Sequence, residues 1–187
     1  MIRAIYIWLS ILALCLITSG VVVGQDDEIR KHPGYVDFSE IKFPVNAEES
    51  VEVTMKGPIL KFVANVAHEE DRSLSRVLGK LLLIRINTFS VENSDLNILH
   101  NSIKKMESKL EGDKWEKIVR VTKRDERVNV FVKNTRENRI DGLVIMAVDD
   151  DDEAVFINIV GELDWESVEK IGHKFDIDHL ENLNADY

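Results

Sequence analysis

The sequence predicts an α+β domain, with helices packed on one face of a mainly antiparallel sheet of about six strands. Six segments are rich in β-branched and aromatic residues, and the last four follow one another between residues 115 and 161 with short polar connections. Four other stretches repeat their apolar residues at helical spacing. Neither an internal repeat nor a second linker interrupts this pattern, so we expect a single domain over residues 51–176.

Residues 1–24 have the pattern of a secretory signal peptide. Arg3 precedes an uncharged apolar run over residues 4–23, and Gly24 is followed by an abruptly acidic stretch. We expect cleavage after Gly24 and a mature protein that works outside the cytoplasm. Two alternatives stay open: a run of about 20 residues can span a bilayer as an uncleaved anchor, and Cys15 could carry a lipid, although Leu14 stands where lipoprotein processing needs a small residue.

The composition limits the partners. The chain has 24 basic and 34 acidic residues and a formal net charge of −10. Such a charge repels phosphate backbones and anionic headgroups, so we expect no nucleic acid partner, and a membrane partner only if the N-terminal segment is uncleaved. Cys15 is the single cysteine and lies in the predicted leader. The mature chain therefore cannot form disulfides, and a packed core must stabilise it.

Residues 25–50 show no sustained period and predict an extended N-terminal segment. Tyr35, Val36 and Phe38 are too apolar for a free tail, so we expect them to dock on the domain. The domain then begins with alternation of Val51, Val53 and Met55, which predicts a half-buried strand. Two helices follow. The first opens at Pro58, and its expected apolar positions are Ile59, Leu60, Val63, Val66 and Ala67. Asp71 to Ser73 offer a turn and a cap for the second, whose expected apolar positions are Leu74, Val77, Leu78 and Leu81.

The rest of the chain predicts five further strands and two further helices. Residues 82–89 predict a strand, and residues 94–111 predict a long helix with Gly112 as its stop. Four strands are expected at 115–123, 127–134, 140–148 and 154–161, the last two central in the sheet. In the second of these, Asn129, Phe131 and Lys133 share a face that we expect to be partly wet. Asp164 caps a final helix, and residues 177–187 form a polar tail.

Several short motifs resemble one known family. They are His32-Pro33-Gly34-Tyr35-Val36-Asp37-Phe38, Trp115, Gly142-Leu143-Val144 and Val155-Phe156-Ile157-Asn158-Ile159-Val160-Gly161. In this order and spacing they resemble the small exported bacterial proteins of domain of unknown function 4252, over about His32 to Gly172. The resemblance implies export to the periplasm or cell envelope of a bacterium. It implies no reaction, because the family has no assigned activity.

The chain departs from the family pattern after Gly161. Glu162-Leu163-Asp164 stands where the family has an acidic residue followed directly by an isoleucine-type pair. This difference weakens any proposal that the acidic residue after Gly161 is a ligand.

The run Asp149-Asp150-Asp151-Asp152-Glu153 falls between two predicted strands. Clustered carboxylates can hold calcium weakly, so the aspartates are weak metal candidates. However, the run lacks the spaced ligands of a dedicated calcium loop. A solvated hairpin tip is the better interpretation, and we expect no metal and no cofactor.

Three polar residues are candidate binding residues: Asp37, Asp141 and Asn158. Asn158 stands in an apolar strand, where its amide must find partners, and we favour hydrogen bonds to the docked segment over a ligand pocket. Asp141 starts a strand beside Gly142, and most such residues are turn or edge groups. If the N-terminal segment docks beside the last strand, Asp37 and Asn158 could converge.

No histidine pair has metal-ligand spacing, and no nucleophile motif is present. The sequence therefore predicts a non-enzymatic envelope module that binds a protein or a small ligand, through a sheet face or the groove beside the N-terminal segment. The alternative is a periplasmic enzyme or weakly cation-dependent protein that uses Asp37, Asp141 and Asn158 with a histidine.

Overall fold

The computed structural model describes residues 26–41, 50–91, 96–136, 139–150 and 153–174. The chain divides into two units, residues 1–32 and 33–187. In the first unit residues 26–30 are helical, where the sequence suggested an extended chain. The leader at 1–24 and the tail at 177–187 lie outside the described residues, so their boundaries stay predictions. Among the described helices, none combines the length and the apolar composition needed to cross a membrane.

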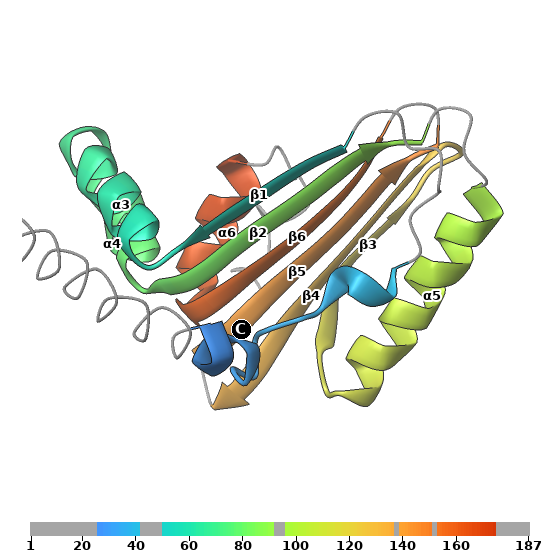
Figure 1. Cartoon of the computed structure of the whole chain (residues 1–187), viewed down its shortest axis with the longest axis horizontal. Helices are drawn as coiled ribbons and strands as arrows, with labels where there is room; N and C mark the ends of the chain where they lie inside the picture. The colour runs from blue at the N-terminus through green and yellow to red at the C-terminus, as the bar shows by residue number, and fades with distance from the viewer. Residues whose placement is uncertain (1–25, 42–49, 92–95, 137–138, 151–152, 175–187) are drawn as a thin grey trace, which may run out of the picture. The chain divides into compact units, whose positions relative to one another are not determined.

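The second unit is built on a six-stranded sheet in which every neighbouring pair is antiparallel. The strand order is β1-β2-β6-β5-β4-β3, and Figure 1 shows the strands side by side in this order. The strands are β1 (Ser50–Lys56), β2 (Leu81–Ser90), β3 (Glu116–Thr122), β4 (Glu126–Arg136), β5 (Arg139–Asp149) and β6 (Glu153–Leu163). The α+β class and the antiparallel sheet are thus confirmed. The strands that are most uniformly apolar, β5 and β6, lie at its centre, as expected.

The helices are the 3-10 turn η1 (Phe38–Glu40), α3 (Pro58–Glu70), α4 (Arg72–Gly79), α5 (Leu96–Gly112) and α6 (Trp165–Lys174). The predicted N-terminal cap of α4 is present, because the Asp71 side chain accepts hydrogen bonds from the amides of Ser73 and Leu74. The predicted helix was too long at its other end. It ends at Gly79, and Leu81 opens β2 and pairs with Gly161.

The helices supply apolar side chains to both faces of the sheet. Val144 and Met146 of β5 pack with α5 and the N-terminal segment in one core. Leu143 and Ile145, on the opposite face of the same strand, share a second core with residues of α3, α4 and α6. We expected helices on one face of the sheet, whereas in the structure helices cover both faces. The reason is that the central strands are apolar on both faces, and each face needs a cover.

Helix α3 covers the sheet with only part of its apolar surface. Leu60 and Ala64 are buried, whereas Ile59, Phe62 and Val66 are 52%, 67% and 56% exposed. The spacing of the apolar residues predicted the helix correctly. It did not separate the side chains that meet the sheet from those that face away.

Helix α5 meets the sheet along the face that the sequence predicts. Its buried side chains include Leu99, Ile103, Met106 and Leu110. The chain leaves the helix through Lys114, whose φ is 62°, and the amide of Trp115 donates to the carbonyl of Leu110 at 2.9 Å. Figure 1 shows α5 beside the β3 and β4 side of the sheet.

Candidate functional site

Residues 33–41 of the N-terminal segment are held on the sheet by the side chain of Asn158 on β6. Its Oδ1 accepts from the amide of Val36 at 2.9 Å. Its Nδ2 donates to the carbonyl of Gly34 at 3.0 Å and to that of Leu143 at 3.3 Å. The side chain is fully buried. Asn158 therefore has the structural role that the sequence favoured, and Val36 and Phe38 are buried in the core as expected.

The segment crosses β5 in direct backbone contact. A Cβ atom built on Gly34 would lie 1.8 Å from the carbonyl oxygen of Asp141, and one on Gly142 would lie 2.5 Å from the Cα of Gly34. The Trp115 ring closes the same crossing, 2.9 Å from the Cβ position on Gly142. The four motifs that carry the family resemblance therefore meet at this crossing.

The other two candidate binding residues hold local structure. Asp37 caps η1, accepting from the amide of Ser39 at 3.0 Å. The Asp141 carboxylate accepts hydrogen bonds from Thr135 Oγ1 and from Arg139 Nε, and only 4% of its side chain is exposed. Asn158 is occupied by backbone partners, so the docked segment does not bring these residues together around an open site.

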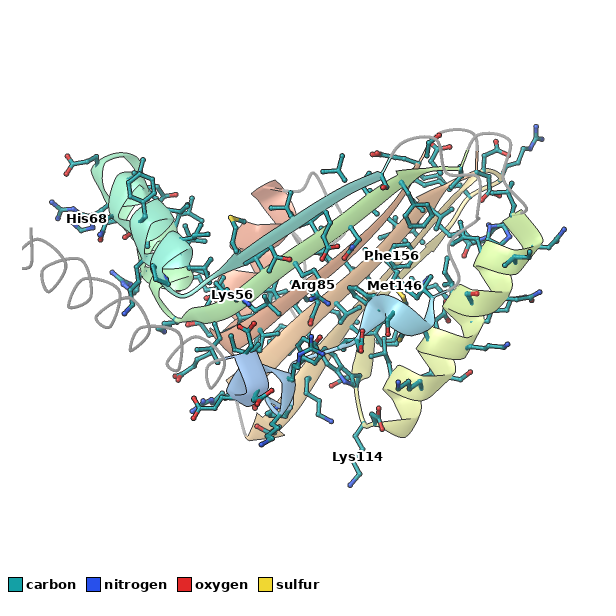
Figure 2. The ribbon with its side chains drawn as sticks, viewed as in Figure 1. Lys56, His68, Arg85, Lys114, Met146 and Phe156 are labelled. Carbon is teal, nitrogen blue, oxygen red and sulfur yellow. The ribbon has the colours of Figure 1, made fainter. Side chains whose placement is uncertain are left out.

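A basic side chain lies beside the docked segment. The guanidinium of Arg85 on β2 is 5.9 Å from the centre of the Tyr35 ring, within the range of a cation–π contact. Its Nε is buried and has no hydrogen-bond partner among the described residues, and it lies 3.8 Å from Oε1 of Glu52. Figure 2 shows Arg85 on the sheet face that carries Phe156. Arg85 thus lies over the Tyr35 ring of the docked segment.

One residue of the acidic run, Asp150, is partly buried rather than fully solvated. Arg127 Nη1 donates to its two carboxylate oxygens at 3.0 and 3.2 Å, and His100 Nε2 lies 2.9 Å from Oδ1. Only 17% of the Asp150 side chain is exposed. The Asp150 carboxylate thus pairs with Arg127 and lies beside His100. Asp151 and Asp152 lie outside the described residues. In the described part of the chain, no three histidine, cysteine, aspartate or glutamate side chains gather closely enough to hold a metal.

A pocket of about 370 Å³ lies between α5 and the strands β3, β4 and β5. This volume is within the range of about 300–1,000 Å³ that is usual for small-molecule sites. Its apolar wall is formed by Ile103, Met146 and Val148, and its polar lining by His100, Lys104, Glu107, Arg120, Thr122, Arg127 and Asn129. Figure 2 shows Met146 on the sheet face turned toward η1 and α5.

Three of the lining residues carry full positive charges: Lys104, Arg120 and Arg127. Among the described lining residues Glu107 is the one acidic side chain, and its Oε2 accepts from Lys117 Nζ at 2.9 Å and from Arg120 Nη2 at 3.4 Å. Arg120 remains 64% exposed, whereas Glu107 is 13% exposed. Arg127 is likewise paired with the carboxylate of Asp150 at 3.0 Å, so the described lining keeps an excess of positive charge only through Lys104.

Two lining groups have no partner within the described chain. Lys104 forms no ion pair with a described residue. Asn129 is 6% exposed, and its Oδ1 is buried without a hydrogen-bond partner. Asn129 lines the pocket, but its Oδ1 is itself enclosed by protein atoms, so a bound group can reach only the end of the amide that faces the pocket.

The pocket residues were visible in the sequence only as parts of other patterns. His100, Lys104 and Glu107 repeat at three and four residues along the predicted long helix, on its polar side. Asn129 lies on the face of β4 that we expected to be partly wet. The signal that could have found the site is this pair of polar faces, one from the helix and one from the strand.

Comparison with models of protein families identifies the family to which the chain belongs. The family model described as "Domain of unknown function (DUF4252)" matches residues 43–171, and these residues include every residue that lines the pocket. No curated protein matches the chain, and no solved structure does so. The family match covers more than half of the chain and includes the motifs at Trp115, Gly142–Val144 and Val155–Gly161, whereas the motif with Gly34 precedes it. The chain belongs to the DUF4252 family.

Proposed function

We propose that this protein is an exported, non-enzymatic binding module and that the pocket beside α5 takes a small anionic ligand. One observation carries the proposal: three cationic side chains line a pocket in which the described carboxylates of Glu107 and the neighbouring Asp150 offset only two of the three charges, in a chain whose formal net charge is −10. In such a chain a local excess of positive charge has no general role in solubility. It is the complement of a negative ligand.

The lining of the pocket favours a small molecule rather than a protein strand as its ligand. Apolar side chains from α5 and β5 form one wall, and the charged groups of α5, β3 and β4 surround it. This combination of an apolar wall with a few polar groups is typical of small-ligand sites. Charge-assisted hydrogen bonds from arginine or lysine would then fix the anionic group.

Export is part of the proposal because of the residues at the start of the chain. A short basic start, an uncharged apolar run and the small residue Gly24 before an acidic stretch support a cleaved leader. Without Cys15, a module in an oxidising compartment depends on its two apolar cores.

The enzymatic alternative has less support. It would need Asp37, Asp141 and Asn158 to act together, yet each has a structural partner near its own strand or turn. These structural hydrogen bonds explain why the three residues are present without a catalytic role.

The binding proposal is tested by isothermal titration of the chain from residue 25 with phenylpropionate and with inorganic phosphate. The variant K104Q/R120Q should weaken binding of the preferred anion by about tenfold, which corresponds to roughly 0.7 kcal/mol for each partly exposed charge. The matched control is K105Q, because Lys105 is an exposed neighbour on the same helix and does not line the pocket. Equal losses in both variants would show that the pocket charges have no specific role.

Export is tested by fusing residues 1–24 to alkaline phosphatase, which folds only outside the bacterial cytoplasm, and by sequencing the N-terminus of the secreted product. Phosphatase activity with an N-terminus at Gln25 supports the proposal. An inactive fusion retained in the cytoplasm would contradict it.

A further inference from the structure

Asn129 is the most unusual side chain of the pocket. It is 6% exposed, it lines the pocket, and its Oδ1 has no hydrogen-bond partner among the described residues. A buried amide in this state costs free energy, and an apolar residue of the same shape would avoid that cost. Its neighbour on the same face of β4, Phe131, is fully buried and apolar. The packing of this face therefore does not itself require an amide at position 129.

The position of Asn129 in the sheet places it between two different environments. Across the strands, Asn129 is paired with Arg120 on β3 and with Met146 on β5. Side chains paired in this way lie on one face, and neighbouring strands are about 4.8 Å apart. The row thus presents a cation, an amide and an apolar side chain in sequence, over about 10 Å.

This inference rests on the proposed function and names the class of its ligand. We propose that the ligand is a hydroxy acid with an apolar body: its carboxylate lies toward Arg120, its hydroxyl pairs with Asn129 and its apolar part packs on Met146. A hydroxyl both donates and accepts, so it can pair with either end of the amide, whichever faces the pocket. A plain carboxylate with an apolar body would leave the amide unpaired.

The test uses two probes that differ by one hydroxyl, phenyllactate and phenylpropionate, titrated into the same protein by calorimetry. We expect the wild-type chain to bind phenyllactate about fivefold more tightly, the effect of one added hydrogen bond. In Asn129→Leu this preference should disappear, while phenylpropionate binds at least as well as before. Asn134→Leu is the matched control, since Asn134 is exposed on the same strand and outside the pocket. It should keep the fivefold preference.

A second measurement separates this role from a structural one. Because Leu replaces an unpaired amide by an apolar group of similar size, the melting temperature of ligand-free Asn129→Leu should equal or exceed that of the wild type. A lower melting temperature would show that the amide stabilises the fold, and would overturn the inference.

The outcomes also distinguish the inference from the proposed function. If the wild type binds both probes equally, the pocket still binds anions but the assignment of Asn129 is wrong. If it binds neither probe and does not bind inorganic phosphate, both the ligand class and the proposed function are wrong. Binding of phosphate alone would leave the anion pocket in place and overturn the hydroxy acid.

Discussion

Gly34 and Gly142 cross with no room for a side chain on either: a Cβ on Gly142 would lie 2.5 Å from the Cα and 2.7 Å from the carbonyl oxygen of Gly34. Both contacts are with backbone atoms, which cannot turn away as a flexible side chain can. The crossing lies next to the hydrogen bonds that Asn158 makes to the segment. Two glycines and one amide, far apart in the sequence, therefore hold the N-terminal segment on β5 and β6.

Replacing either glycine at the crossing should destabilise the fold. Gly34→Ala or Gly142→Ala forces a Cβ into the facing backbone, so we expect the free energy of unfolding in urea to fall by about 2–4 kcal/mol. Gly112→Ala, at the end of α5, is the control, because a Cβ there meets nothing within 4 Å. That change should leave the protein equally or slightly more stable. Similar stabilities for all three variants would contradict the crossing.

Asn158→Leu tests the hydrogen bonds that hold the segment. The change leaves the Val36 amide and the Gly34 carbonyl without their partner, and we expect the free energy of unfolding to fall by about 2–4 kcal/mol. Hydrogen exchange of the Val36 amide should become much faster. The control is Asn101→Leu, at an exposed position of α5. Unchanged protection of Val36 in Asn158→Leu would exclude the role assigned to this side chain.

Asp164 should make stability depend on pH. Its carboxylate accepts hydrogen bonds from the hydroxyl of Ser167 at 2.5 Å and from the amide of Ser167 at 2.8 Å. The Ser167 hydroxyl, against the opposing effect of partial burial, lowers the pKa of Asp164 below its ordinary value of 3.8. Because the folded pKa is depressed, the stabilisation is present above the unfolded pKa and is lost as pH falls through the folded one.

The measurement compares the wild type with Asp164→Ala in urea. At neutral pH the variant should be less stable by about 0.5–2 kcal/mol, the usual cost of a lost helix cap. The difference should shrink at acidic pH, once the wild-type carboxyl is protonated. Asp113→Ala, at an exposed position after α5, provides the control. A difference that grows as the pH falls would contradict the assignment.

Glu107→Gln should separate stability from binding. The change removes the carboxylate that holds Lys117 at 2.9 Å and Arg120 at 3.4 Å, so the free energy of unfolding should fall by about 1 kcal/mol. At the same time Arg120 is released toward the pocket, and phenylpropionate should bind more tightly. Glu116→Gln, exposed and outside the pocket, should change neither quantity. Weaker binding of phenylpropionate by Glu107→Gln would show that Glu107 positions the ligand rather than opposing it.

Much of the fold follows from local patterns. Helical spacing in α5 and the predicted caps at Asp71–Ser73 and Asp164 each act over a few residues, and all are present in the structure. Alternation predicted the strand β1 correctly but not its half-buried face, since Val51 and Val53 are 58% and 37% exposed. The placement of β5 and β6 at the centre followed from their uniformly apolar residues. The faces that the helices cover could not be predicted in the same way, because they depend on contacts between elements distant in the sequence.

The candidate site, too, could be predicted from the sequence only in part. Asn158 could be identified because an amide in an apolar strand needs partners, and its partners lie in the segment expected to dock. The pocket could not, because it forms only where the polar residues beside the apolar face of α5 come close to β3 and β4 in the folded chain. Asp150 illustrates the difference: in sequence it is one of five adjacent acidic residues, and only the sheet brings it to Arg127.

The measurement that tests the binding proposal most directly is the location of a bound anion. Amide chemical shifts of the isotope-labelled chain from residue 25 should be followed as phenyllactate is added. We predict that the largest changes fall in residues 100–107 of α5, 120–129 of β3 and β4, and 146–148 of β5, which line the pocket. Changes concentrated elsewhere, with these three stretches unaffected, would contradict the assignment of the pocket as the binding site.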